Sequence, residues 1–333
     1  MNFRPTFRVT ADGADISGIL APRLSSIEVI DRAGVESDSA VIEMADAPPF
    51  RIALPRTGAV LEVALGYFPA AEVLGRFVVD EVTLSGPPDT MTITARAAAH
   101  DETSDGQTEL QTQRTRSFPD GTTLGDLVET LAGDHGLEPA IADDLAAVVP
   151  PHIDQLAESD MSLLTRIAAN YGAIAKPAGG RLAVVRRGEG QSASGQPLPT
   201  VTLTPAQVSS WSATIARREE AKTVIAVWRD LGAAEDREVE VGEGEPVRRL
   251  RHTLPDEESA RAAAEAELER AARQGAKVSV TLPGRADLMA EGKLLLVGFR
   301  EGVAGEWTIE SVTHRLDTGG YSCTVEAEQV EGE

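Results

Sequence analysis

The sequence has one cysteine, few aromatic residues and no long hydrophobic run, and each shortage excludes a class of protein. Cys323 has no second cysteine with which to form an internal disulfide. Only 4% of the residues are aromatic, and they are scattered, which argues against a stacking surface for sugars or single-stranded nucleic acid. No segment approaches the roughly 18 apolar residues that suggest a membrane span. The N-terminus, MNFRPTFRVTADG, lacks the apolar run of a signal peptide. We therefore expect a protein that is made in the cytoplasm and stays soluble there.

Basic residues are also scarce. The chain has 31 Lys and Arg against 53 Asp and Glu, a formal net charge of −22 over 333 residues. A duplex-binding domain needs cations to neutralise phosphates, so stable nucleic-acid binding is not expected. The acidic charge serves either solubility or a surface along which DNA slides without sticking, and the net charge alone does not separate the two.

The first hundred residues have the pattern of β-structure. Short alternating runs are separated by turn residues such as Asp12-Gly13 and Gly86-Pro87-Pro88, which predicts a barrel or sandwich over residues 1–100. The polar, Thr- and Gln-rich residues 101–118 are interpreted as a linker or long loop. The expected strands are 6–10, 25–31, 40–44, 60–67, 76–84 and 91–96.

The period then changes to that of helices. Leucines and valine at 124, 127, 128 and 131 form an amphipathic stripe that begins at a Thr123/Asp126 capping box and stops at Gly136. A second stripe runs from Leu164 to Tyr171, capped by Ser159 or Asp160. With a short strand at 181–187, residues 119–187 are predicted to form a small α/β insert domain.

After a flexible linker at 188–199, GEGQSASGQPLP, the β pattern resumes and predicts a second β domain over residues 200–333. One long helix at about 256–274 interrupts it. Apart from Leu268 its apolar residues are nearly all alanine, which indicates a surface helix or one packed close to a backbone. The overall fold class is α+β, mainly β.

No catalytic, cofactor-binding or metal-binding constellation is recognisable. None of the five histidines has a partner at a ligand spacing, and His100-Asp101-Glu102 is interpreted as a strand end that runs into a polar loop. There is no G-x-S-x-G, Walker or G-x-G-x-x-G motif. The sequence therefore predicts neither an enzyme nor a cofactor.

Two stretches carry a family resemblance. The first is QLAESDMSLLTRIAANYG at 155–172, and the second is GEWTIESVTH at 305–314 followed by GGYSCTVE from 319. Both resemble the phage late-control D protein family, the tail hubs of contractile phages, which in turn resemble the hub portion of type VI secretion VgrG spike proteins. The motif residues are given structural roles only: Glu158, Ser159, Asp160, Leu164, Tyr171, Gly172, Trp307, His314 and Gly320.

The resemblance implies two tube-like β-barrel domains per subunit and a homotrimer with pseudo-six-fold symmetry. Such a hub is a structural symmetry adaptor that joins the hexameric tail tube to a trimeric spike at the centre of the baseplate. Because the chain ends at Glu333, soon after its last strand, the spike is expected to be a separate polypeptide. The other partners implied are tape-measure and baseplate wedge proteins, and the location is a virion tail or injection particle assembled in the bacterial cytoplasm.

The residues also indicate an internal duplication. With an offset of 230, residues 75–97 and 305–327 share Gly75/Gly305, Val82/Val312, Thr83/Thr313, Thr94/Thr324 and Ala97/Ala327. The preceding strands correspond after a further shift of two. Matching alternation places equivalent residues on the inner face of both β domains.

Two alternatives stay open. The chain is the hub of an infectious phage or of a tailocin or other contractile injection system, which capsid genes beside it would distinguish. A cell-wall-binding or cell-wall-degrading protein is the other class, but it would need exposed aromatics beside convergent carboxylates, and residues 119–187 offer only Tyr171, with Phe118 at their margin.

Overall fold

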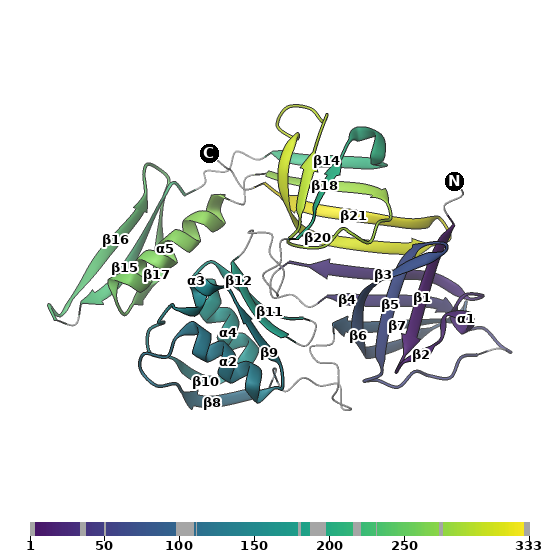
Figure 1. Cartoon of the computed structure of the whole chain (residues 1–333), viewed down its shortest axis with the longest axis horizontal. Helices are drawn as coiled ribbons and strands as arrows, with labels where there is room; N and C mark the ends of the chain where they lie inside the picture. Colours follow the sequence, from purple (N-terminus) through teal and green to yellow (C-terminus); the bar gives the residue numbers. More distant parts are fainter. Residues whose placement is uncertain are drawn as a thin grey trace. The chain divides into compact units, whose positions relative to one another are not determined.

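A computed structural model gives the fold of the chain (Figure 1). It divides into two compact units that interleave in the sequence. Unit 1 comprises residues 1–107, 199–212 and 278–327, and unit 2 comprises residues 108–198, 213–277 and 328–333. The structure describes residues 4–33, 38–49, 51–97, 110, 112–178, 181–186, 198–215, 221–230, 232–272 and 276–329. His100-Asp101-Glu102 and almost all of the linker expected at 188–199 lie outside these ranges.

Unit 1 is built on one 13-stranded sheet, to which the first and last parts of the chain both contribute. The order along the sheet is β14-β18-β21-β20-β3-β4-β7-β6-β5-β1-β2, and β19 pairs with β20 and with β13. The strands are β1 (Pro5–Ala11), β2 (Ala14–Asp15), β3 (Leu24–Arg32), β4 (Ser39–Ala45), β5 (Val60–Tyr67), β6 (Ala70–Ser85), β7 (Thr90–Ala97), β13 (Thr200–Leu203), β14 (Ser210–Ile215), β18 (Ala276–Pro283), β19 (Lys293–Leu296), β20 (Gly305–Asp317) and β21 (Gly320–Glu328). The short helix α1 (Ser17–Leu20) follows β2.

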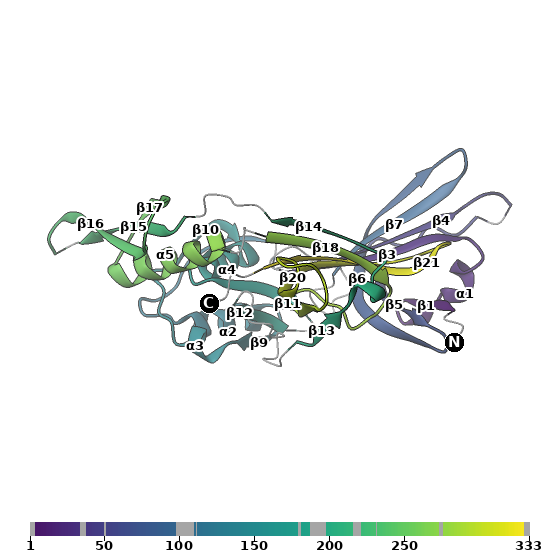
Figure 2. The same cartoon turned by 90° about the horizontal axis from the view of Figure 1, so that it is seen from above.

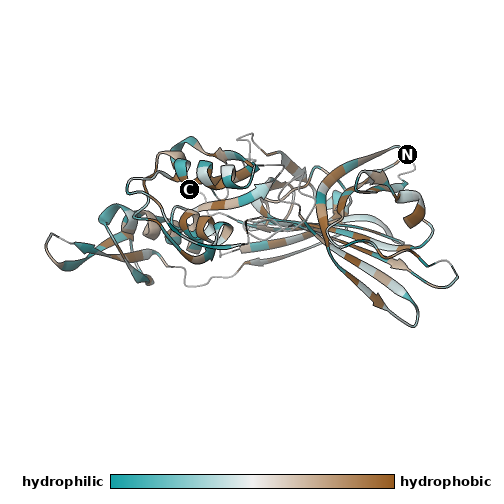
Figure 3. Ribbon diagram, turned by 90° about the horizontal axis from the view of Figure 1, so that it is seen from below, coloured by the Kyte–Doolittle hydropathy of each residue, from teal (hydrophilic) through white to brown (hydrophobic). Residues whose placement is uncertain are grey.

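Alternation along these strands creates the core of unit 1. In β7 the apolar side chains of Met91, Ile93 and Ala95 are buried, and the threonines between them are partly exposed. Hydrophobic and hydrophilic residues accordingly alternate along the strands in Figure 3. Burial of one face fixes the register, because a slip of one residue would turn every apolar side chain toward solvent.

Two segments of unit 1 have the same strand order. Strands β5, β6 and β7 form an antiparallel meander, and β19, β20 and β21 follow one another in the sheet in the same order. Leu61 pairs with Phe77, and Leu294 pairs with Trp307. This register matches Leu61 with Leu294, one residue beyond the shift that the sequence suggested, because the paired positions are 16 residues apart in the first hairpin (Leu61 and Phe77) and 13 residues apart in the second (Leu294 and Trp307).

The meanders join through β3 and β20, which Figure 1 shows beside each other in purple and yellow. The strands that flank each meander also correspond in chain order: β4 lies beside β7 (Figure 2), and β18 lies beside β21. One pairing differs, since β1 runs antiparallel to β5 whereas β13 runs parallel to β19.

The first part of unit 2 is an α/β assembly. It contains a two-stranded sheet, β10-β8, and a three-stranded sheet, β11-β12-β9. The elements are β8 (Gln113–Ser117), α2 (Leu124–Asp134), β9 (Glu138–Ile141), α3 (Asp143–Ala146), β10 (Asp154–Ser159), α4 (Asp160–Ala169), β11 (Ala173–Ala178) and β12 (Arg181–Arg186). The linker expected at 101–118 is wrong at its end, because residues 113–117 pair with β10 as a strand.

Local sequence explains where helix α2 begins and ends. Thr123 Oγ1 accepts a hydrogen bond from the amide of Asp126 at 3.0 Å, and the Asp126 carboxylate accepts one from the amide of Thr123, so the predicted capping box is confirmed. The predicted stripe of α2 is fully buried. Its stop is confirmed too, since Gly136 has φ +64°, a conformation that suits glycine.

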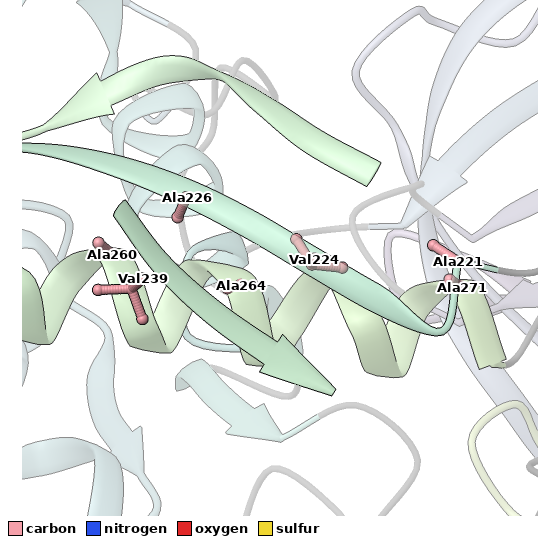
Figure 4. Packing of buried hydrophobic residues seen from close by; sticks show 7 residues of the cluster. All are labelled: Ala221, Val224, Ala226, Val239, Ala260, Ala264 and Ala271. Atoms are coloured by element: carbon pink, nitrogen blue, oxygen red, sulfur yellow. The ribbon is translucent and has the colours of Figure 1, made fainter. Parts of the chain in front are cut away.

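The second part of unit 2 is a small sheet covered by one helix. The sheet β16-β15-β17 consists of β15 (Thr223–Asp230), β16 (Glu235–Gly242) and β17 (Val247–Leu254), and the helix is α5 (Glu257–Ala272). Its core is made mostly of small residues: Ala221, Val224, Ala226, Val239, Ala260, Ala264 and Ala271. Figure 4 shows the alanines of α5 facing β15 and β16, so small side chains bring the helix close to the strands.

This part corrects one expectation and decides another. The domain expected over residues 200–333 is interrupted, because residues 213–277 belong to unit 2. Of the two positions expected for the alanine-rich helix, the surface position is wrong and packing close to a backbone is correct, because the alanines of α5 form a core with β15 and β16. Strand alternation does not reveal which sheet a strand joins, so the sequence pattern missed the interruption.

Candidate assembly site

The motif residues at 158–160 lie where β10 turns into α4. Ser159 is the N-cap of α4, and its hydroxyl accepts a hydrogen bond from the amide of Ser162 at 3.2 Å. Glu158 forms an ion pair with Arg166 in the last turn of the helix. Of the two capping residues that the sequence allowed, Ser159 is therefore the cap, and Asp160 has another position.

Asp160 is the centre of a buried ionic network. Its side chain has no exposed surface. One carboxylate oxygen accepts hydrogen bonds from Arg116 at 2.8 Å and from Gln155 at 2.7 Å, and the other lies 2.7 Å from His135 Nε2. Arg116 also binds Asp134 at 2.6 Å. The network thus connects β8, α2, β10 and α4 through side chains.

The ionised form of Asp160 is favoured in the fold. Burial alone would raise its pKa, but hydrogen bonds from Gln155 and His135 and the charges of Arg116 and Arg114 outweigh burial and hold the pKa of the carboxyl below its ordinary value. A carboxylate that is buried, charged and fully hydrogen-bonded contributes to one specific packing of the elements around it.

Tyr171 and Gly172 lie just after α4 and contact α5. Burial raises the pKa of Tyr171, as do the charges of Asp256 and Glu258, and its side chain is hydrogen-bonded to Ser259 in the first turn of α5. Gly172 has φ +63°, and a Cβ added there would lie 3.6 Å from Glu269. This tyrosine-glycine corner therefore joins the two parts of unit 2, whereas Leu164 is an ordinary core residue with no exposed surface.

The other motif residues lie in unit 1. Trp307 is fully buried, and its indole Nε1 donates to the carbonyl of Val303 at 2.9 Å. His314 is buried against Tyr321, with Nδ1 2.9 Å from the phenolic oxygen. Gly320 is the first residue of β21, and its φ of +121° is one that side-chain-bearing residues rarely adopt. These three residues belong to unit 1, whereas residues 158–172 belong to unit 2.

A second contact of His314 invites a catalytic interpretation. Cys323 Sγ lies 3.2 Å from its Nδ1. Burial raises the pKa of the thiol to about 11, however, and lowers the pKa of the imidazole, so both groups are neutral at pH 7. A buried, protonated thiol is not a nucleophile. Within the described ranges, no three His, Cys, Asp or Glu side chains are grouped to hold a metal ion.

Exposed apolar side chains are the remaining candidates for contacts. Phe68, at the turn between β5 and β6, is 71% exposed, and Trp211 on β14 is 40% exposed with its ring edge-on to Phe299. Such anchors are what protein interfaces bury. Among the described residues of unit 1, the exposed large apolar side chains are Ile19, Leu54, Phe68, Val73, Leu84, Trp211 and Val297.

Strand edges offer a second kind of contact. The described edge strands of the unit 1 sheet are β14, β2 and β13, and those of the small sheet in unit 2 are β16 and β17. An edge strand carries unpaired backbone donors and acceptors, so it is a template for pairing with another chain. In the part of the chain that the structure describes, no helix is both long and apolar enough to cross a bilayer.

Sequence reasoning missed the ionic network, because Arg116 fell in the supposed linker and Asp160 was interpreted only as a helix-capping residue. One signal was available. Residues 113–117, QRTRS, alternate arginine with polar residues in the manner of a half-buried strand.

Comparisons with known proteins agree with this architecture. The family model described as phage tail baseplate hub (GPD) matches residues 79–320. The probable baseplate hub protein of Escherichia phage P2 is 32% identical to this chain, over 97% of the chain and 93% of the phage protein.

Solved structures share the fold. A tail protein of Neisseria meningitidis MC58 superimposes with a TM-score of 0.72 at 12% identity, over 98% of this chain and 97% of its own. A component of the E. coli type VI secretion system, described as similar to the phage T4 tail proteins gp27 and gp5, gives 0.58 at 12% identity, over 98% and 77%. The matched hubs are structural proteins of the virion baseplate rather than enzymes. The chain belongs to the phage tail baseplate hub (GPD) family, as the motifs at 155–172 and 305–326 predicted.

Proposed function

We propose that three copies of this chain form a hub with pseudo-six-fold symmetry, which joins the hexameric tail tube to a trimeric spike at the centre of the baseplate. The observation that carries the proposal is the repeated strand order in unit 1. Strands β5-β6-β7 and β19-β20-β21 are meanders of the same order, so each copy offers two similar surfaces and three copies offer six.

Equivalent burial supports an internal duplication. Phe77 and Trp307 are both buried at matching positions of the two meanders. The buried residues Met91, Ile93 and Ala95 of β7 match Tyr321, Cys323 and Val325 of β21, which are buried as well. The proposed duplicates are two tube-like barrels, 1–100 and the unit 1 segments after residue 199, with the α/β part inserted between them.

The proposed partners follow from this position. The six similar surfaces suit the tail tube, and the opposite face of the trimer suits a spike, with tape-measure and wedge proteins as further baseplate contacts. The particle is assembled in the bacterial cytoplasm. The motif residues at 158–172 and 307–320 serve this role as packing and joint residues.

The net charge of −22 suits a hub through which DNA passes, because the protein repels the phosphates instead of binding them. Fluorescence anisotropy with labelled duplex at low salt tests this part. We expect no saturable binding at micromolar protein, and binding with a steep salt dependence would contradict it.

Sedimentation velocity and negative-stain microscopy test the proposal as a whole. We expect a closed trimer of the intact chain, and six-fold features on the face that caps rings of the tube protein. A monomer at all concentrations, or a ring of any other order, would refute it. Capsid genes beside this gene are expected for a phage, and their absence for a tailocin.

A further inference from the structure

The two edges of the small sheet in unit 2 carry opposite charge. Strand β16 has four acidic residues and one arginine, with the sequence EDREVEVG. Strand β17 has three arginines, one histidine and no acidic residue, with the sequence VRRLRHTL. A basic strand of this kind stands out in a chain whose net charge is −22.

Both edges are open. The strand order is β16-β15-β17, so each outer strand has one neighbour among the described residues. On β16 only Val239 is buried, and on β17 every residue is exposed except the half-buried Leu250 and Leu254. Helix α5 packs its alanines on one face of the sheet (Figure 4), and no described strand pairs with the outer side of β16 or β17.

Some of these charged side chains form ion pairs within unit 2. Arg248 binds Glu267 of α5 at 2.6 Å, and Arg249 reaches across β15 to Glu238 at 2.7 Å. Glu240 on β16 and Arg251 on β17 are exposed, and neither forms an ion pair with another described residue. Each edge therefore retains a charge of its own sign for an outside partner.

We propose that β17 of one copy pairs edge to edge with β16 of the next copy, and that this contact closes the ring. The proposal rests on the trimer proposed above and assigns one of its interfaces. Because β17 runs parallel to β15 and β16 runs antiparallel to it, a rotation about an axis along the strands brings β17 against a neighbour's β16 in antiparallel pairing.

The charges favour a second copy over another partner. A different protein whose edge strand carries one sign of charge would complement either β16 or β17, but not both. A copy of this chain supplies both, and the contact is head to tail, which is the kind that generates closed rings. Complementary charge fixes the register and excludes pairing of two identical edges, since β16 repels β16 and β17 repels β17.

Charge reversal tests this interface in the intact chain. Arg251→Glu places an acidic residue of β17 opposite the acidic β16 of the next copy at every interface of the ring. Glu240→Arg places a basic residue of β16 opposite the basic β17. We expect each single variant to raise the dissociation constant of the ring at least about tenfold per interface, because an attractive exposed pair becomes repulsive. The double variant restores attraction with the two signs exchanged, and keeps the net charge of −22.

Glu265→Arg is the matched control. Glu265 is exposed on α5, forms no ion pair among the described residues, and changes the net charge as Glu240→Arg does. Sedimentation velocity reports assembly, and circular dichroism reports the fold of each variant. Weakened single variants with a rescued double variant support the inference. Single variants that form the ring as tightly as the control overturn it while the trimer stands, and a wild type that stays monomeric overturns both proposals.

Discussion

Replacing Asp160 with asparagine removes one charge from the buried network and keeps the shape of the side chain. Removing one partner of a buried ion pair costs about 3–5 kcal/mol, because the other charges stay buried without compensation. Asparagine keeps one oxygen for Arg116 and Gln155, which bind the same oxygen in the native chain. We therefore expect about 3 kcal/mol, the lower end of that range.

Hydrogen exchange followed by mass spectrometry measures this loss locally. The network joins β8, α2, β10 and α4, so peptides from these elements lose protection together, by a factor of about a hundred for 3 kcal/mol. Glu158→Gln is the matched control, since Glu158 is the acid two residues earlier and its partner Arg166 has a side chain that is 53% exposed. A surface pair of this kind contributes about 0–1 kcal/mol.

The pH dependence gives an independent check. Because the pKa of Asp160 is lowered in the fold, its contribution is complete above the ordinary Asp value of about 3.9 and is lost as the pH falls through the lower folded value. Asparagine does not titrate, so the Asp160→Asn variant lacks the part of the pH dependence of stability that Asp160 contributes. Equal protection of Asp160→Asn and Glu158→Gln, or an unchanged acid dependence, would show that the network does not hold these elements.

Three further predictions concern packing and reactivity. Trp307→Ala costs about 3–5 kcal/mol in urea unfolding because Trp307 is fully buried, and Trp211→Ala costs clearly less; equal losses would contradict the assigned core. Gly242→Ala places a Cβ 2.2 Å from a backbone carbonyl at φ +92° and lowers the exchange protection of β16, whereas Gly133→Ala meets nothing within 4 Å and raises the protection of α2. Cys323, with its pKa raised to about 11, resists iodoacetamide at pH 8 until urea unfolds the chain, and rapid labelling of the native protein would refute its burial.

Sequence patterns predicted the elements whose signals are local. The capping box and stripe of α2 lie within a dozen residues, and the alternation of β7 is complete within the strand itself. Local patterns do not show which distant segments of the chain pair with each other. Nothing around Thr223–Asp230 distinguishes a strand of the small sheet from a strand of unit 1, because period-two alternation is common to both.

The network around Asp160 shows the same limit for side chains. Its members come from four elements, and each taken alone has an ordinary explanation: a capping acid, an arginine in a polar stretch, a glutamine before a helix. Asp160 becomes buried only when these elements pack together, and its burial is the reason that its charge requires the charged and hydrogen-bonding partners around it.

The pairing of β3 with β20 has a consequence for synthesis. Glu28 and Arg315, which form an ion pair at 2.8 Å, are 287 residues apart in the chain. At roughly 5–20 residues per second, β20 leaves the ribosome on the order of 15–60 s after β3, and until then the β3 edge has no partner. The α/β part of unit 2 is complete much earlier, so it is free to fold while the sheet of unit 1 waits for its last strands. The nascent chain therefore exposes an open strand edge for most of its translation. During that time chaperones or chains on neighbouring polysomes compete with β20 for the backbone hydrogen-bonding groups of β3.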